Sequence, residues 1–191
     1  FSKGSFPKTC SIPTGLGKTS VMAVWLLALA RNARAADGTL FPRRLVYVVN
    51  RRTVVDQSTR EAERMRQALR TKPELEEVAD ALRSLAVDRQ EPLAISTLRG
   101  QFADNAEWCA DPSRPAIVVG TVDMIGSRLL FAAYGRGYRT RPLHAGFLGQ
   151  DALLVHDEAH LEPAFQALVE AIEEEQAARR DLRPLRAMAL T

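Results

Sequence analysis

Four residues near the start of the chain, Gly15, Gly17, Lys18 and Thr19, have the types and spacing that bind phosphate groups. Phosphates need converging backbone N–H groups, the positive end of a helix dipole and a neutralising cation. The glycines let the backbone curl around the phosphates, Lys18 would reach the β- and γ-phosphates, and the Thr19 hydroxyl would bind Mg²⁺. Ile12 stands where the full phosphate-loop pattern has its first glycine. We therefore expect ATP, with Mg²⁺, to be bound by the following segment: Thr14, Gly15, Leu16, Gly17, Lys18, Thr19 and Ser20.

A second chemical motif, Asp157-Glu158-Ala159-His160, follows the apolar run at residues 153–155. Open α/β sheets place their ligand sites at the carboxyl edge of the strands, where these side chains would lie. Asp157 would hold Mg²⁺ through its hydration shell, and Glu158 would orient and polarise the attacking water. His160 would sense the γ-phosphate. The residues expected to act in catalysis are Lys18, Asp157, Glu158 and His160. The neighbouring His156 is given no catalytic role.

Basic, hydroxyl and small residues follow three further apolar runs, at residues 45–49, 93–97 and 116–119. Such side chains suit phosphate-backbone contacts that carry no sequence information. Two structural alternatives stay open, because Thr121 could cap the next helix and Arg51 could be a solvated surface charge. The residues expected to contact nucleic acid are Asn50, Arg51, Arg52, Thr53, Arg99, Gly100, Thr121 and Asp123.

Short apolar strands and longer amphipathic stretches alternate along the chain and must position these motifs. Strands are expected at residues 9–13, 45–49, 93–97, 116–119, 153–156 and 186–190. Helices are expected at residues 18–34, 53–70, 73–85, 122–133 and 163–179. The alternation predicts an α/β domain with a mainly parallel central sheet and helices on both faces.

The composition of the 191 residues is that of an ordinary globular protein, with 46% hydrophobic and 26% charged residues. A net charge of +3 favours an anionic partner. Two cysteines far apart provide neither a disulfide framework nor a zinc site, so we expect a reduced, cytoplasmic setting. The longest apolar run, residues 21–30, is about half of what spans a bilayer, so we expect a buried helix and no membrane partner.

Together these motifs resemble those of superfamily 2 helicases, in the same order along the chain. The segments at residues 14–19, 50–53 and 157–160 resemble motifs I, Ia and II, and Arg99-Gly100 and residues 121–123 resemble the Ib and Ic region. Ala189-Leu190-Thr191 is similar to the start of motif III. The resemblance implies a RecA-like P-loop domain that works as an ATP-dependent helicase. The absence of an Asn-Lys-x-Asp segment disfavours a GTPase.

Three stretches resemble, more narrowly, the CRISPR-associated helicase-nuclease of type I systems, in the style of type I-G (formerly I-U). They are PTGLGKTSVM at residues 13–22, VNRRTVVDQ at 49–57 and VVGTVDMIGSRLL at 118–130. This resemblance implies ATP-driven 3′-to-5′ translocation on single-stranded DNA and recruitment by an RNA-guided surveillance complex. It also implies a His-Asp nuclease domain. No such motif occurs in this sequence, so the nuclease domain is expected elsewhere in the full protein.

We expect residues 1–191 to be a single RecA-like domain truncated at both ends, without the second RecA-like domain or the nuclease. Such a fragment is expected to bind ATP weakly and to hydrolyse it very slowly. Three alternatives remain: an RNA helicase, a restriction-type DNA translocase, and a non-catalytic nucleotide-dependent binding domain.

Overall fold

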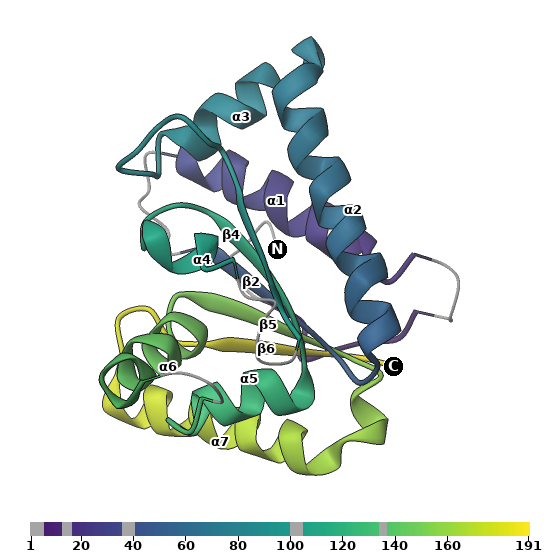
Figure 1. Ribbon diagram of the computed structural model, residues 1–191, viewed down its shortest axis with the longest axis vertical. Coiled ribbons are helices and arrows are strands. Elements are labelled where there is room, and N and C mark those ends of the chain that lie inside the picture. Colours follow the sequence, from purple (N-terminus) through teal and green to yellow (C-terminus); the bar gives the residue numbers. More distant parts are fainter. Residues whose placement is uncertain (1–5, 13–16, 36–40, 100–104, 134–136) are drawn as a thin grey trace.

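Six short strands form one sheet in which every strand pair is parallel (Figure 1). The computed structural model describes residues 6–12, 17–35, 41–99, 105–133 and 137–191. The sheet order is β1-β6-β5-β2-β4-β3. The strands are β1 (Thr9–Cys10), β2 (Arg44–Val49), β3 (Ala94–Leu98), β4 (Ala116–Thr121), β5 (Ala152–Asp157) and β6 (Arg186–Leu190). The predicted α/β architecture with a central parallel sheet is confirmed.

Helices cover both faces of the sheet (Figure 1). One face carries α1 (Ser20–Ala33), α2 (Arg52–Thr71) and α3 (Glu76–Arg83). The opposite face carries α4 (Glu107–Ala110), α5 (Val122–Leu129), α6 (Arg141–Gly149) and α7 (Pro163–Arg179). Three short 3₁₀ turns complete the described elements, at Pro73–Leu75 (η1), Tyr138–Thr140 (η2) and Ala159–Leu161 (η3). The chain is thus a three-layer sandwich, which the two-sided burial of parallel strands requires.

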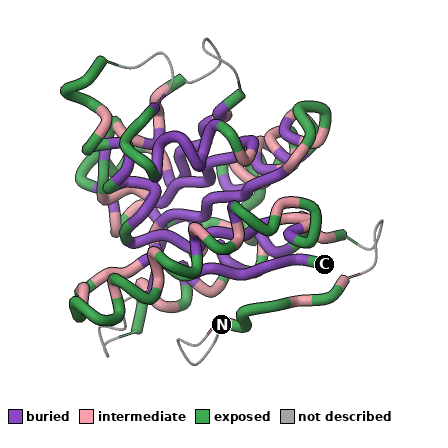
Figure 2. The backbone as a smooth tube through the Cα atoms, turned by 90° about the horizontal axis from the view of Figure 1, so that it is seen from below, coloured by how far each residue is buried: buried purple, intermediate pink, exposed green. Residues whose placement is uncertain are grey.

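The strands lack the alternation of half-exposed strands because helices bury both of their faces (Figure 2). Every residue of β2 is buried. Leu45, Tyr47 and Val49 belong to the core that faces α1, α2 and α3, whereas Val46 and Val48 belong to the core that faces α4–α7. Fully burying one such apolar side chain contributes about 1.5–3 kcal/mol. The sheet therefore provides a rigid base for the segments that follow each strand.

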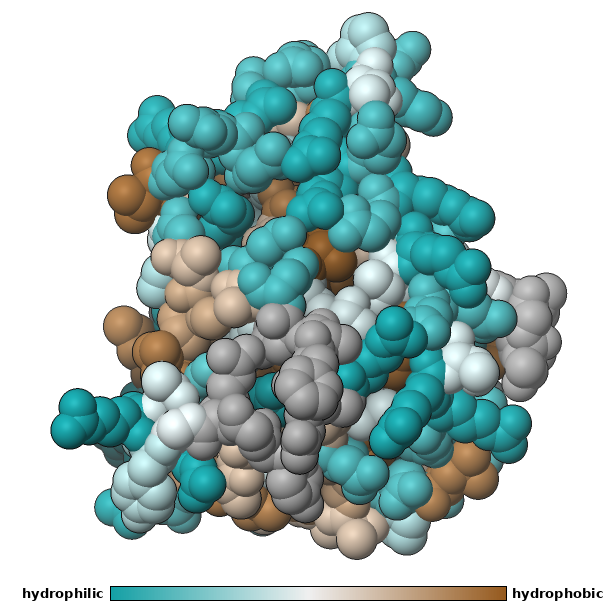
Figure 3. Space-filling view, in the orientation of Figure 1, coloured by the Kyte–Doolittle hydropathy of each residue, from teal (hydrophilic) through white to brown (hydrophobic). Residues whose placement is uncertain are grey.

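The helix α1 contains the apolar run at residues 21–30, and its inner side is core. Met22 and Trp25 are fully buried, and Trp25 donates its indole N–H to the carbonyl of Pro42 at 3.0 Å. Within the described residues, no helix is long and apolar enough to cross a membrane. The outer surface over α2 and α3 is hydrophilic (Figure 3), which is consistent with their alternating arginine and glutamate residues.

Two helices, α4 and α6, were not expected from the sequence. Pro142, Gly146 and Gly149 are turn-forming residue types, yet α6 forms because Pro142 occupies its first turn and its inner side is buried. Phe147 of α6 packs edge-on against Trp108 of α4, with ring centroids 5.8 Å apart. Two other helices are shorter than predicted: α5 ends at Leu129 instead of residue 133, and α3 begins only after the turn at Pro73–Leu75.

Gly120, near the end of β4, has no room for a side chain. A Cβ atom there would lie 2.9 Å from Ile125 Cδ1 and 3.2 Å from Leu98 Cβ. Gly120→Ala should therefore lower the free energy of unfolding by about 1–3 kcal/mol, measured by urea denaturation. Gly146→Ala is the matched control, because a Cβ in that helix would meet nothing within 4 Å. The control should be neutral or stabilising by up to about 1 kcal/mol. Equal effects of the two substitutions would contradict this explanation.

Candidate functional site

The carboxyl ends of all six strands lie on the same edge of the sheet, and the predicted motifs follow them there. Asp157 at the end of β5 is in register with Leu190 of β6, which is in register with Cys10 of β1. The pairing of β1 with β6 continues one step further, where Ile12 N donates a hydrogen bond to the carbonyl of Thr191 at 3.0 Å. The phosphate-loop segment therefore follows β1, which is separated from the Asp157 strand β5 by the single strand β6.

The segment from Gly17 to Ser20 leads into α1, as expected of a phosphate loop. Gly17 has φ +82°, a left-handed conformation that favours glycine, and its carbonyl accepts a hydrogen bond from Ser20 N at 2.8 Å. Lys18 and Thr19 immediately precede the helix, near the positive end of its dipole. Thr14, Gly15 and Leu16 lie outside the described residues, so their roles stay predictions.

Lys18 and Asp157, from the two separate motifs, come together. Lys18 Nζ lies 3.4 Å from Asp157 Oδ1, and the two side chains are 11% and 13% exposed. The other carboxylate oxygen, Oδ2, accepts a hydrogen bond of 3.0 Å from the hydroxyl of Tyr47 in β2. Burial and the nearby Asp157 charge raise the pKa of Tyr47 well above its usual value, so this hydroxyl stays protonated and donates. This role of Tyr47 was not predicted, because the residue lies within the apolar run of β2.

The donor set fits a magnesium ion that completes its shell with water and phosphate oxygens. Apart from its ion pair with Lys18, Asp157 Oδ1 is buried without a hydrogen bond to the described part of the chain, so it can contribute to such a shell. The partly buried hydroxyl-bearing Thr19 lies at the start of α1. Among the described residues, no group of three or more His, Cys, Asp or Glu could hold a metal alone. Thr19 and Asp157 would therefore hold Mg²⁺ together with a bound nucleotide, and the ion would neutralise phosphate charge.

Glu158 follows Asp157 directly and adopts a left-handed conformation with φ +53°. A non-glycine residue in this region costs about 1–3 kcal/mol and is often found at functional sites. The carbonyl of Glu158 accepts a hydrogen bond from Leu161 N at 2.9 Å, which starts the 3₁₀ turn η3. The Glu158 side chain is half-buried and makes no hydrogen bond to any described residue, whereas His160 is exposed. Glu158 is thus free to contact a water molecule.

His156 is a core residue, in agreement with the absence of a predicted catalytic role. The ring is fully buried, and its Nδ1 lies 3.1 Å from Oε1 of Gln166 in α7. It also packs edge-on against Phe165, with ring centroids 4.9 Å apart. Burial lowers the pKa of His156, so the ring is neutral. Its contacts attach α7 to β5, the strand that carries Asp157.

The expected nucleic-acid residues that the structure describes lie at the same sheet edge but in different environments. Arg51, Arg52 and Thr53 are exposed at the start of α2. Both polar side-chain atoms of Asn50 are buried, without a hydrogen bond to the described residues. Thr121 does act as a helix cap, since its hydroxyl accepts a hydrogen bond from Met124 N at 3.4 Å, and Asp123 is exposed in the first turn of α5. Gly100 lies outside the described residues.

Arg99 follows β3 and forms an ion pair with Asp56 of α2, a residue that the sequence did not single out. Its Nη1 donates to Asp56 Oδ2 at 2.6 Å. Arg99 and Asp56 line a cavity that is also lined by Arg60 of α2. Arg52, Asp56 and Arg60 are spaced four residues apart, so they share one face of the helix. This four-residue spacing can be read from the sequence, but the ion pair of Asp56 with Arg99 is seen only in the folded structure.

Tyr47→Phe should raise the Mg²⁺ concentration needed for half-maximal ATP hydrolysis by about tenfold, because a hydrogen bond to a charged group is lost. The ring remains and fills the same space, so the free energy of unfolding should change little. The matched control is Tyr138→Phe, because Tyr138 is 82% exposed and distant in sequence from the motifs. Identical Mg²⁺ titrations for the two variants would show that Tyr47 does not position Asp157.

Comparison with known protein families gives one finding. A family model described as "Type III restriction enzyme, res subunit" (ResIII) matches residues 2–180. The matched range contains both the Gly17–Ser20 segment and the Asp157–Glu158 pair. No curated protein matches the chain.

Proposed function

The chain belongs to the type III restriction enzyme res subunit family, and from that premise we propose that it hydrolyses ATP to move along single-stranded DNA. Membership supports the coarser statement directly: this is a superfamily 2 helicase-like ATPase domain with a RecA-like fold. The observation that carries the proposal is the meeting of Lys18 and Asp157 on the same sheet edge as the exposed Arg51 and Arg52.

The chemistry proposed for this edge is attack of water on the γ-phosphorus of ATP. The bond from that phosphorus to the β–γ bridging oxygen breaks, and ADP and inorganic phosphate leave. Lys18 would neutralise charge on the phosphates, and Glu158 would orient the water and accept its proton. Because little covalent chemistry is required of the protein, positioning by β5 and by the start of α1 accounts for these roles.

Movement would arise from coupling between the nucleotide and the basic strand ends. A second RecA-like domain would close over ATP, grip the nucleic acid and supply an arginine, a contribution of about 10³–10⁵ in rate where such arginines act. Hydrolysis would then release the grip. His160, which is exposed and lies two residues after Glu158, would report the γ-phosphate to that partner.

The biological setting that we propose is DNA interference by a CRISPR-associated helicase-nuclease. It is supported by the stretches at residues 13–22, 49–57 and 118–130, and it would make an RNA-guided surveillance complex the partner. A restriction-type DNA translocase is the second candidate, because the family description names a restriction enzyme subunit.

Displacement of streptavidin from biotinylated strands tests translocation. The full-length protein, with the proposed second RecA-like domain, should displace streptavidin from the 5′ end of single-stranded DNA in an ATP-dependent reaction, faster than from the 3′ end. Duplex DNA as the preferred track would favour the restriction-type translocase, and RNA would favour an RNA helicase. No ATP-dependent displacement from any strand, together with no ATP hydrolysis, would leave a nucleotide-dependent binding domain and contradict the proposal.

A further inference from the structure

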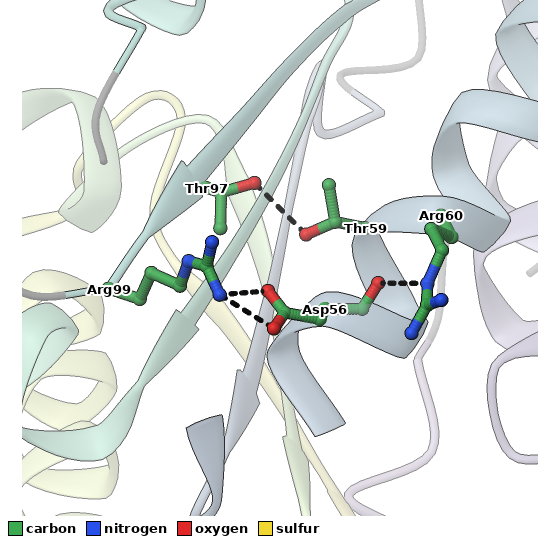
Figure 4. A pocket seen from close by; sticks show the side chains of 5 residues that line it. All are labelled: Asp56, Thr59, Arg60, Thr97 and Arg99. Atoms are coloured by element: carbon green, nitrogen blue, oxygen red, sulfur yellow. Dashed lines mark hydrogen bonds and ion pairs between the residues drawn. The ribbon is translucent and has the colours of Figure 1, made fainter. Parts of the chain in front are cut away.

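A cavity of about 490 Å³ lies between α2 and the carboxyl end of β3 (Figure 4). Its described lining consists of Asp56, Thr59, Arg60, Thr97 and Arg99. All five side chains are polar or charged, and the two arginines flank Asp56 from opposite sides. Such a lining suits a small anionic group better than an apolar ligand.

Much of the hydrogen-bonding capacity around this cavity is unused. Arg99 contacts both oxygens of Asp56 through Nη1 alone, at 2.5 and 2.6 Å. Its Nε and Nη2 make no hydrogen bond to the described residues. Among the described residues, Arg60 donates only through its Nε, to the backbone carbonyl of Asp56 at 3.2 Å. Each guanidinium carries five N–H donors, so both arginines have donors left for a phosphate while their contacts with Asp56 are still in place.

The hydroxyl groups of the cavity are equally adaptable. Thr59 and Thr97 lie 3.0 Å apart, oxygen to oxygen, and either one can be the donor. A hydroxyl rotates to suit its partner, so one of them could turn towards an anion while the other keeps the contact. Thus both elements that border the cavity present donors to its interior.

Asp56 is the one carboxylate in the described lining, and it neutralises Arg99. The two side chains are 41% and 45% exposed, and ion pairs as exposed as this contribute little to stability. An incoming phosphate oxygen can therefore replace Asp56 on Arg99 at low cost. The negative charge of Asp56 would meanwhile oppose the incoming phosphate.

We propose that this cavity receives a phosphodiester group of a nucleic-acid strand, and that Asp56 holds Arg99 in place until that group replaces it. The inference rests on the proposed function and adds to it a phosphate site and a competitor, Asp56, which limits nucleic-acid affinity. In this site Arg60, Thr59 and Thr97 would contact the phosphodiester group, in addition to the expected Arg99.

A nucleic-acid strand is favoured over a free anion because the cavity continues a basic surface. Arg52, Asp56 and Arg60 share one face of α2. Arg52 is exposed and is the first residue of this helix, close to the carboxyl end of β2. The cavity thus joins the segment after β2 to the segment after β3. A chain of phosphates can follow such a row, whereas a free phosphate ion would use only one part of it.

The test is equilibrium binding of a fluorescently labelled oligo(dT) to the protein, followed by fluorescence anisotropy over a range of salt concentrations. Asp56→Asn should tighten binding by about threefold to tenfold, because the competitor loses its charge. Glu91→Gln is the matched control, because it changes the net charge by the same amount. Glu91 pairs with Arg70 of α2, and their side chains are 39% and 41% exposed. The control therefore also leaves a partly exposed arginine of α2 without its carboxylate partner. The control should change affinity by less than about twofold.

Two arginine variants complete the test. Arg60→Ala should weaken binding and reduce the slope of log affinity against log salt by about 0.7, the value for one lost contact to a single strand. In an Arg99→Ala background, Asp56→Asn should lose its advantage. Melting temperatures measured for every variant separate lost binding from lost folding.

Three outcomes would overturn the proposal. Equal effects of Asp56→Asn and Glu91→Gln would mean that only long-range charge matters. Competition by inorganic phosphate at constant ionic strength, with oligo(dT) affinity unchanged in both Arg60→Ala and Asp56→Asn, would assign the cavity to a free anion. Absence of oligo(dT) binding by the wild-type protein would overturn the proposed function together with this site. In the first two outcomes the proposed function would stand.

Discussion

Replacing Glu158 with glutamine should lower the rate of ATP hydrolysis by about 10²- to 10⁴-fold. The amide keeps the size of the side chain but cannot accept a proton from the attacking water. The Glu158 side chain is half-buried beside Asp157 and makes no hydrogen bond to the described residues, so its replacement should not disturb the fold. Binding of ATP with Mg²⁺ should stay within about twofold of wild type, because Glu158 would act only in the reaction.

Single-turnover hydrolysis and equilibrium ATP binding, measured on the same preparation, separate these two effects. Glu162→Gln provides the control, because this carboxylate lies only four residues further, at the start of α7. The control should hydrolyse ATP at nearly the wild-type rate. If both variants retain full activity, Glu158 is not the water-orienting residue.

Lys18→Ala should reduce ATP affinity by at least about 30-fold, as expected when one partner of a largely buried charge pair is removed. Lys18 Nζ lies 3.4 Å from Asp157 Oδ1, and both side chains are largely shielded from water. Without the lysine, nearby phosphates would face an uncompensated carboxylate. The substitution thus removes the attraction between Lys18 and the phosphates and leaves the repulsion between Asp157 and the phosphates uncompensated.

Titration with a fluorescent ATP analogue in the presence of Mg²⁺ measures the change. Lys72→Ala is the matched control, since Lys72 is exposed at the end of α2. The control should bind the analogue as wild type does. Equal affinity of the Lys18→Ala and Lys72→Ala variants would remove the phosphate-binding role of Lys18.

The sequence predicted the sheet well because parallel strands buried on both faces are short, continuous apolar runs. The run at residues 45–49 is β2 apart from Arg44, which is buried and donates to the carbonyls of Phe147, Pro112 and Gln150. An arginine at a strand start carries no apolar signal, so the boundary was missed. The helix α6 was missed for a related reason: its proline and glycines suggest a loop, whereas tertiary burial of residues such as Phe147 and Leu148 stabilises the helix.

The candidate site was predictable where chemistry follows a strand directly. Asp157 and Lys18 are brought together, as the motifs indicated. Tyr47 and Asp56 were not predictable, because their roles depend on contacts across 110 and 43 residues of chain. A tyrosine within an apolar run and an aspartate on a helix carry no functional pattern in the sequence, and only the fold brings Asp157 to Tyr47 and Arg99 to Asp56.

The steady-state rate of ATP hydrolysis by the full-length protein, with the proposed second RecA-like domain, tests the central claim most directly when it is measured as a function of oligo(dT) concentration. That claim is that one sheet edge binds ATP and couples its hydrolysis to nucleic acid. The rate should rise with oligo(dT) to a plateau in wild type and stay near zero throughout in Glu158→Gln. An ATPase rate that does not respond to nucleic acid, or stimulation that survives in Glu158→Gln, would contradict the claim.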